Sequence, residues 1–217
     1  PNSIRQEELI KVIEGLNQDD TIDAILVQLP VPKHIDRNAI LSAIDYRKDV
    51  DGLHPMNVGL LNSSQKGVIP CTPRGIISLL KEEGIEITGK HCVVIGRSNL
   101  VGKPMAQLML NENASVTICH SKTRDLAALT RQAEILIIAI GCPNLVTAEM
   151  LKEGAVVIDV GINNVDGKLV GDIYNSIDVS GIEKKAAAIS PVPGGVGPMT
   201  IASLLQNTVD LYKMHIQ

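Results

Sequence analysis

The chain has 217 residues, of which 45% are hydrophobic and 20% charged, and this balance is typical of a folded globular protein rather than a disordered one. Lys and Arg total 20 against 24 for Asp and Glu, so the formal net charge is -4, which argues against a nucleic-acid-binding face. No apolar run is long enough to span a membrane. Aromatic residues make up only 1%, so Ile, Leu, Val, Ala and Met must build the core.

The cysteines do not indicate a metal site. None of Cys71, Cys92, Cys119 and Cys142 belongs to a Cys-x-x-Cys pair, and no His lies at ligand spacing near two of them, so no zinc is expected. Cys92 and Cys119 lie inside apolar runs, as small buried residues in a reducing compartment do. The sequence opens without a signal peptide, so we expect a cytoplasmic location.

The first 71 residues predict a small α/β region. Apolar residues at helical spacing predict a helix over 4–16, and a continuous apolar run predicts a buried strand over 23–29. Asp36 is a candidate N-cap for a second helix over 37–44. The stretch 45–70 is dense in turn-forming residues and is expected to be irregular, and long irregular segments inside compact domains are often functional.

From residue 72 onward the pattern is regular. Thr72 as N-cap and Pro73 at the first position predict a helix that Gly84 ends. Apolar runs then alternate with helical segments, which predicts a parallel sheet covered by helices on both faces. A Gly-rich loop at 193–197 and a helix over 199–213 close the chain. The strands are expected at 91–95, 115–119, 134–140 and 155–160, and the helices at 100–110, 123–133 and 147–151.

The segment GRSNLVG at 96–102 follows an apolar strand and opens a helix. A dinucleotide-binding fold places its pyrophosphate loop there, because a helix N-terminus offers free N–H groups and the positive end of the helix dipole. Ser98 stands where the G-x-G-x-x-G fingerprint has its middle glycine, so the alternative is a strand-to-helix turn with no ligand. The alternation of strands and helices around this loop favours a nucleotide site.

The next strand indicates which dinucleotide would bind. An NAD site usually carries an acidic residue about 20 positions on, which bonds the ribose 2′-hydroxyl. Here the strand 115–119 runs into His120, Ser121 and Lys122 without an acid. Since a carboxylate would repel a 2′-phosphate, its absence favours NADP, with Arg97 and Ser121 in reach. A guanidinium suits a phosphate, whereas the alternative for Arg97 is a solvated surface charge.

Five further positions are candidate ligand sites. Gly141 and Gly161 follow strands of the predicted sheet, where parallel sheets bind ligands, or else form simple turns. PVPGGVGP at 191–198, with three glycines and three prolines, specifies its backbone path before a helix, as a ligand loop or a rigid turn. Gln28 ends a predicted buried strand and needs partners. Asp51 is either a turn carboxylate or a site carboxylate.

Five motifs in order carry a family resemblance: VQLPVP, DVDGLHPMNVG, PCTPRG, GRSNLVGKP and PVPGGVGPMT. Over essentially the whole chain, they resemble the bifunctional methylenetetrahydrofolate dehydrogenase/cyclohydrolase family in its bacterial form. The resemblance implies NADP-dependent oxidation of 5,10-methylenetetrahydrofolate to 5,10-methenyltetrahydrofolate and hydrolysis to 10-formyltetrahydrofolate. It also implies a homodimeric enzyme of one-carbon metabolism that serves purine biosynthesis.

The resemblance further implies an α/β fold with a Rossmann-type NADP-binding domain over 72–190. Residues 1–71 would form the remainder of a smaller α/β catalytic domain that binds folate. Residues 191–217, the Gly-rich loop and the last helix, would return to that catalytic domain. The tetrahydrofolate substrate would lie in the cleft between the two domains.

Site residues follow by matching motifs. Gln28 resembles an active-site amide near the catalytic group, with Leu29 and Pro30 beside it. Asp51 resembles the carboxylate that binds the pterin ring, since a carboxylate accepts paired hydrogen bonds from pterin N–H groups. The backbone of Pro193, Gly194 and Gly195 would lie where folate and nicotinamide meet. The residues implied in NADP binding are Gly96, Arg97, Ser98, Ser121 and, near the nicotinamide, Ile162.

One family motif has no counterpart. The family carries an upstream Tyr-x-x-x-Lys whose Lys is the acid/base residue of the cyclohydrolase step, and Tyr46 precedes Lys48 at the wrong spacing. The chain thus resembles a member without its N-terminal part, and we expect weak or no cyclohydrolase activity, with hydride transfer surviving better. The alternatives are another NADP-dependent dehydrogenase, which would not need both DVDG and PGGVGP, and a non-catalytic cofactor-binding module.

Overall fold

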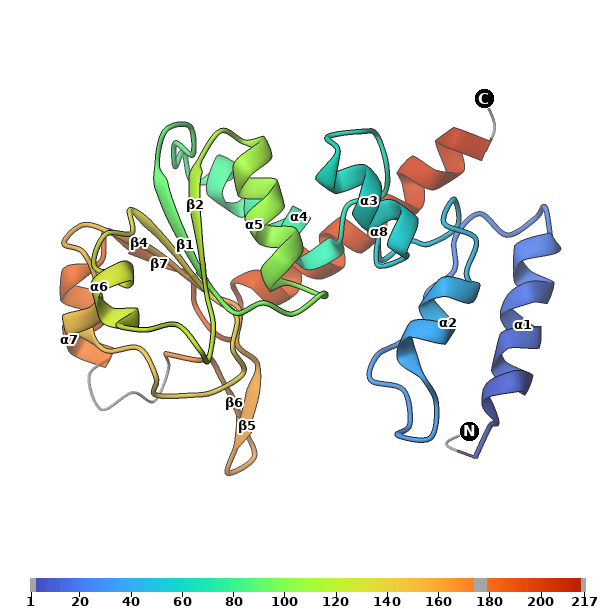
Figure 1. Ribbon diagram of the computed structural model, residues 1–217, viewed down its shortest axis with the longest axis horizontal. Helices are drawn as coiled ribbons and strands as arrows, with labels where there is room; N and C mark the ends of the chain where they lie inside the picture. The colour runs from blue at the N-terminus through green and yellow to red at the C-terminus, as the bar shows by residue number, and fades with distance from the viewer. Residues whose placement is uncertain (1–2, 174–178, 216–217) are drawn as a thin grey trace. The chain divides into compact units, whose positions relative to one another are not determined.

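The computed structural model describes residues 3–173 and 179–215, and the chain divides into two compact units (Figure 1). The first unit comprises Pro1–Cys71 and Ser203–Gln217, and the second comprises Thr72–Ala202. The last helix, α8 (Val196–His215), begins in the second unit and ends in the first. The first unit therefore combines two segments that lie far apart in the sequence.

The first unit contains α1 (Gln6–Gln18), α2 (Arg37–Ala43) and α3 (Pro55–Asn62). The first two confirm the predicted helices: α1 is shifted by two residues at each end, and α2 begins at the predicted residue and ends one residue early. Asp36 caps α2 as predicted, because its carboxylate accepts the N–H of Asn38 at 2.8 Å. The core residues of this unit are all aliphatic: Ile13, Ile25, Ile35, Ile40, Leu41 and Ile44.

The predicted strand over 23–29 is wrong. Among the described residues of this segment only Ile25 pairs, with Asp49, in an isolated parallel bridge. The Ile25 N–H donates to the Lys48 carbonyl at 2.7 Å, and the Val50 N–H donates to the Ile25 carbonyl at 3.4 Å. A longer strand needs a longer partner, and here the partner segment turns at Gly52, which has φ +69°.

The expectation of an irregular stretch over 45–70 is also wrong in part, because α3 lies inside it. The His54 ring nitrogen Nδ1 accepts the N–H of Met56 at 3.0 Å, so His54 caps this helix. Pro55 occupies the first helical position, where its missing N–H costs nothing. His54 as N-cap followed by Pro55 is a signal for the start of a helix, and the prediction missed it because the segment is rich in turn-forming residues.

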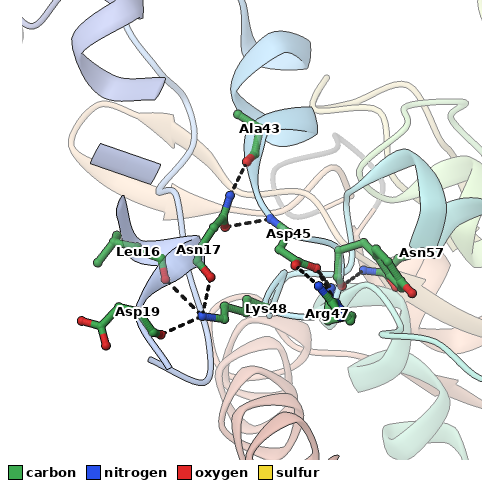
Figure 2. A network of polar contacts seen from close by, with 9 residues as sticks. Leu16, Asn17, Asp19, Ala43, Asp45, Arg47, Lys48 and Asn57 are labelled. Carbon is green, nitrogen blue, oxygen red and sulfur yellow. Dashed lines mark hydrogen bonds and ion pairs between the residues drawn. The ribbon is translucent and has the colours of Figure 1, made fainter. Parts of the chain in front are cut away.

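Lys48 ends α1. Its Nζ donates to the carbonyls of Leu16, Asn17 and Asp19 at 3.2, 2.8 and 2.8 Å (Figure 2). The last carbonyls of a helix have no partner within the helix, and no basic residue lies in the last turn of α1. The Asn17 amide also donates to the Ala43 carbonyl at 2.7 Å. The buried Lys48 side chain therefore satisfies three backbone groups at once.

We expect Lys48→Met to destabilise the protein by about 1–3 kcal/mol, because the methionine keeps the apolar stem but leaves the α1 carbonyls without their donor. Urea denaturation followed by circular dichroism measures the loss. Lys11→Met is the matched control, since Lys11 is exposed on the same helix and its substitution should stay within about 0.5 kcal/mol. Equal stabilities of the two variants would contradict this role for Lys48.

The second unit is built on a five-stranded parallel sheet of order β2-β1-β3-β4-β7. The predicted strands at 91–95 and 115–119 are confirmed at both ends, and those at 134–140 and 155–160 are shorter than expected. Strand β7 was not predicted. The strands are β1 (His91–Ile95), β2 (Ser115–Cys119), β3 (Ile135–Ile138), β4 (Val156–Asp159) and β7 (Ala188–Ile189).

A two-stranded hairpin of β5 (Asn163–Val165) and β6 (Lys168–Val170) follows β4 and was also not predicted. Asp166 and Gly167 form its turn, both at positive φ, and an Asp-Gly pair is a strong hairpin signal. The strands are only three residues long, so they lacked the alternation that predicts a strand. The short helix α7 (Val179–Lys185) was missed as well.

The other helices correct several predicted ends. Helix α4 (Cys71–Glu82) begins one residue before Thr72, so Thr72 is not its N-cap and Pro73 is its third residue. Gly84 follows the helix at φ +66°, as predicted. Helix α6 (Leu126–Thr130) is shorter than expected, because Asp125 at φ +47° caps it. The remaining elements are α5 (Gly102–Asn111) and the short 3₁₀ helix η1 (Ala148–Met150).

Side chains alternate between the two faces of the sheet. Val93, Leu136 and Val157 belong to a core cluster that also takes in residues of α6, η1 and α7. The intervening Val94 and Ile137 are fully buried on the opposite face. Figure 1 shows α5 on one side of the sheet and α6 and α7 on the other. Both faces are therefore covered, as predicted, and the ends of the strands are left to bind ligands.

Candidate functional site

The carboxyl ends of β1 to β4 lie at one edge of the sheet, and the loops after them carry the predicted NADP residues. Gly96 follows β1, Ser121 lies two residues after β2, and Ile162 lies three residues after β4. The chain goes from β1 to β2 on one side and then crosses to β3 on the other. In open α/β sheets, ligands bind outside the carboxyl ends at such a switch of direction.

Two glycines shape the loop between β1 and α5. Gly96 has φ +124°, and a Cβ there would collide with the carbonyl oxygen of Ala139 in the chain after β3. A Cβ on Gly102 would collide with the Gly96 carbonyl and lie 2.8 Å from the Arg97 nitrogen. The first turn of α5 therefore lies directly against the loop. This close packing brings the N-terminus of α5 to the end of β1, which is where a dinucleotide-binding fold places its pyrophosphate.

Ser98 orders the same loop. Its hydroxyl oxygen accepts the N–H groups of Val101 and Gly102 at 3.1 and 3.3 Å. These donors lie at the start of α5, where N–H groups have no acceptor within the helix. The Arg97 side chain is exposed at this edge. The sequence did not predict the capping contacts of Ser98.

The loop after β2 is a tight turn that lies beside the loop after β1. The His120 N–H donates to the Thr123 hydroxyl at 2.8 Å, and the His120 ring accepts the Lys122 N–H at 3.1 Å. The Gly96 N–H donates to the Cys119 carbonyl at 2.8 Å, which keeps the loops after β1 and β2 adjacent. Ser121 is exposed in this turn, on the same edge as Arg97.

Two buried carboxylates that the sequence reasoning missed lie behind the other loops of this edge. Asp159, at the end of β4, and Asp172, after β6, are 1% and 0% exposed. Burial raises the pKa of Asp159, whereas backbone N–H bonds, that of Ile173 first, lower it, and the net shift is upward. The sequence signal that could have predicted Asp159 is an acidic residue at the end of the apolar run AVVID.

The predicted PGG loop precedes α8 in the second unit. Pro193 and Gly194 are exposed and Gly195 is buried, with its N–H donating to the Pro191 carbonyl at 2.9 Å. A Cβ on Gly195 would lie 2.5 Å from that carbonyl oxygen, so the turn requires glycine. Beyond it, the Thr200 hydroxyl donates to the Thr72 hydroxyl at 3.1 Å and ties the start of α8 to the start of α4.

In the first unit, the DVDG segment is fixed by Asp49. Its Oδ2 accepts the His54 N–H at 2.8 Å and the Asn57 side-chain amide at 2.9 Å. Its Oδ1 is buried and has no hydrogen-bond partner among the described residues. A Cβ on Gly52 would lie 2.7 Å from the backbone of Ile69. Burial raises the pKa of Asp49, with the His54 N–H opposing that shift.

Asp51 is half-buried beside Cys71. Burial raises the pKa of Asp51, a hydrogen bond with the Cys71 thiol lowers it, and the charge of Asp49 raises it further. Burial raises the pKa of Cys71 to about 12, so the thiol stays protonated and acts as a donor rather than a nucleophile. The buried Asn207 of α8 donates to the Val50 carbonyl at 2.8 Å and holds this segment. Sequence reasoning missed Asn207.

Gln28 does not sit at the end of a buried strand as predicted. Its side chain is exposed, and its amide donates to the neighbouring Leu29 carbonyl at 2.9 Å. The parallel Ile25–Asp49 bridge sends the two chain segments onward in the same direction, with Gln28 three residues after the bridge and Asp51 two residues after it. The exposed Gln28 amide is thus available for a ligand.

The structure brings the predicted residues together within each unit. The second unit places Gly96, Ser98, Ser121 and Ile162 on the loops of one sheet edge, and the first unit places Gln28 and Asp51 after the bridge. Among the residues that the structure describes, no group of three or more His, Cys, Asp or Glu could hold a metal ion. No helix within that part of the chain is long and apolar enough to span a membrane.

Residues 70–216 match the NAD(P)-binding domain of tetrahydrofolate dehydrogenase/cyclohydrolase, and residues 1–51 match its catalytic domain. The chain belongs to this family. The bifunctional protein FolD of Exiguobacterium sibiricum is 54% identical over 213 residues, which cover 98% of this chain and 76% of that protein. The resemblance stated from the five motifs is therefore confirmed.

Solved structures agree with this assignment. The bifunctional FolD of Campylobacter jejuni is 52% identical with a TM-score of 0.93, over 98% of this chain and 74% of that one. The Trypanosoma brucei enzyme, solved with NADP and an inhibitor, is 42% identical with a TM-score of 0.91, over 100% of this chain and 75% of that one. The α/β fold with an NAD(P)-binding domain is thus confirmed.

Proposed function

We propose that this chain catalyses NADP-dependent oxidation of 5,10-methylenetetrahydrofolate to the 5,10-methenyl cation, and that the same site takes part in hydrolysis of that cation to 10-formyltetrahydrofolate. We expect the hydrolysis to be the weaker activity, because the 217 residues contain no Tyr-x-x-x-Lys. The observation that carries the proposal is the loop 96–102, where two glycines let the start of α5 pack directly against the end of β1. Membership of the family supports both reactions.

The residues of the second unit suit NADP. When bound, NADP accepts a hydride, with its two electrons, from the methylene carbon of the folate. Gly96 and Gly102 let the backbone and the positive end of α5 approach the pyrophosphate. Arg97 and Ser121 offer donors to the 2′-phosphate, with no carboxylate following β2 to repel it. Ile162 is 66% exposed and offers an apolar surface to the nicotinamide ring.

Candidate folate-binding residues are found in the first unit and, separately, in the PGG loop of the second. We assign the pterin ring to Asp51, whose carboxylate accepts two N–H donors, and place Gln28 near the reacting carbon, with Leu29 and Pro30 beside it. The PGG backbone at 193–195 suits the meeting point of folate and nicotinamide, because it carries little side-chain bulk. Hydride transfer moves no proton, so in this step these groups need to orient the ring. Hydrolysis of the resulting cation adds water and releases one proton.

The remaining assignments extend this proposal. The first unit would bind folate, and the second would bind NADP. We propose a cytoplasmic homodimer whose 10-formyl product supplies purine biosynthesis. Size-exclusion chromatography with light scattering tests the dimer independently of activity.

Turnover tests the function directly. We expect the purified chain to oxidise 5,10-methylenetetrahydrofolate with NADP, and the methenyl product to appear in the absorbance spectrum. NADPH binding without turnover would favour the second candidate, a cofactor-binding module, for which the 96–102 loop alone suffices. Turnover of a small hydroxy acid in place of folate would indicate a different dehydrogenase and overturn the proposal.

A further inference from the structure

Asp172 connects two loops at the carboxyl edge of the sheet. Its Oδ2 accepts the N–H groups of Ile140 and Gly141 in the loop after β3, both at 3.0 Å. Its Oδ1 accepts the side-chain amide of Asn163 at 2.9 Å, in the segment after β4. One fully buried carboxylate therefore fixes the loop after β3 against the loop after β4.

Asp159 holds Asp172 in turn. Its Oδ1 accepts the N–H groups of Gly161 and Asp172, both at 2.9 Å, and its Oδ2 accepts the N–H of Ile173 at 2.9 Å. The Asp159 N–H donates to the Ser190 hydroxyl at 2.8 Å, which anchors the pair to the end of β7. Asp159 and Asp172, together called the carboxylate clamp, thus accept six hydrogen bonds.

The backbone around the carboxylate clamp leaves room for it. A Cβ on Gly161 would collide with the Asp172 carboxylate, and a Cβ on Gly171 would collide with the Asp159 carboxylate. Burying two carboxylates is costly unless each is well hydrogen-bonded, and here the donors come from the loop after β3, from the segment 161–163 after β4 and from residues 172–173 after β6. An arrangement this specific indicates that the geometry of these loops matters.

The clamped loops carry one half of the candidate cofactor site. Ile162, a large apolar residue that is 66% exposed, lies between Gly161 and Asn163, and both of these neighbours bond to the clamp. None of the six bonds reaches the loops after β1 and β2, which carry Arg97 and Ser121. The clamp therefore holds the Ile162 side of the edge directly, whereas the loop after β1 has its own support in the Gly96 N–H bond to the Cys119 carbonyl.

We infer that Asp172, held by Asp159, is a positioning residue for the nicotinamide half of NADP and not for its adenosine half. This inference rests on the proposed function and deepens it. Loss of the clamp frees the loops after β3 and β4, so the nicotinamide loses a preformed surface while the 2′-phosphate and the pyrophosphate keep theirs.

The test compares Asp172→Ala with the unsubstituted chain, using NADP and 2′,5′-ADP, the adenosine half alone, in calorimetric titrations. We expect Asp172→Ala to weaken NADP binding by about tenfold or more, the size of a lost hydrogen bond to a charged group, and 2′,5′-ADP binding by less than about twofold. Asp172→Asn keeps the shape and should restore part of the NADP affinity.

Glu134→Ala is the matched control, because Glu134 accepts the N–H of His91 at 3.0 Å at the opposite edge of the same sheet. This variant should change neither affinity. Asn163→Ala removes only the Asn163 bond to Asp172 and carries the test if Asp172→Ala fails to fold, with a smaller loss confined to NADP.

An equal loss for both ligands, or no loss for either, would overturn the inference. Failure of the proposed function has a different signature, because it appears in the unsubstituted chain, which would then bind neither NADP nor 2′,5′-ADP or would bind both without turnover.

Discussion

Gly102→Ala should weaken NADP binding by about 100-fold, which corresponds to about 2.7 kcal/mol. A Cβ at this position collides with the Gly96 carbonyl, so α5 and the loop 96–102 must move apart. Forcing an extra methyl group into a closely packed site costs about 1–3 kcal/mol, and here the displaced atoms are those proposed to hold the pyrophosphate. The affinity is measured by calorimetric titration with NADP, and the fold by circular dichroism.

Gly15→Ala is the control for this substitution. Gly15 lies inside α1 with nothing within 4 Å of an added Cβ, so alanine should raise the stability by about 0.5–1 kcal/mol and leave NADP binding unchanged. If Gly102→Ala bound NADP as tightly as Gly15→Ala, the loop 96–102 would not be the cofactor site.

The sheet of the second unit was predictable because strands buried on both faces are written as continuous apolar runs. The 91–95 strand, which lies inside the sheet, is confirmed at both ends for this reason, whereas the 115–119 strand is confirmed although it is an edge strand with only Cys119 buried. The run 23–29 has the same composition but pairs only at Ile25, since composition does not tell whether a partner strand is present. Pairing is a tertiary property, and no local pattern encodes it.

The polar residues that shape the loops could not be predicted for a related reason. Asp159 bonds to groups 2, 13, 14 and 31 residues away, and Asn207 bonds to a carbonyl 157 residues away. Spacing rules address neighbours on one helix or strand and miss such contacts. The loop 96–102 was predictable because its position between a strand and a helix is itself the signal.

Asp51→Asn should lower kcat/KM for 5,10-methylenetetrahydrofolate by about 100-fold or more and leave NADP affinity unchanged. A carboxylate accepts paired N–H donors from a pterin ring, whereas an amide offers one acceptor and turns a second donor toward the ring. Hydrogen bonds to charged groups contribute about 1.5–3 kcal/mol each, so loss of one accounts for this factor. Steady-state kinetics with each substrate varied in turn separate the two effects, and an equal loss of NADP affinity would contradict the assignment.

The same carboxylate should make the folate step sensitive to pH. Burial first, and then the charge of Asp49, raise the pKa of Asp51, while the Cys71 hydrogen bond opposes them. The ionised form accepts the pterin N–H groups, so kcat/KM for folate should fall as the pH drops through this raised pKa, above the ordinary Asp value of about 3.9. NADP affinity over the same pH range is the reference, because it does not depend on Asp51.

Asp49→Asn tests whether Asp51 is the group that causes this pH dependence. The His54 N–H and the Asn57 amide both donate to Oδ2 of Asp49, so the single carbonyl oxygen of asparagine can accept both and keep the turn in place. Removing the Asp49 charge removes a repulsion that raises the pKa of Asp51, so that pKa falls and the acid limb of kcat/KM moves to lower pH. An acid limb that stayed in place or moved to higher pH would show that the titrating group is not Asp51, because no other change in this variant favours the ionised carboxylate.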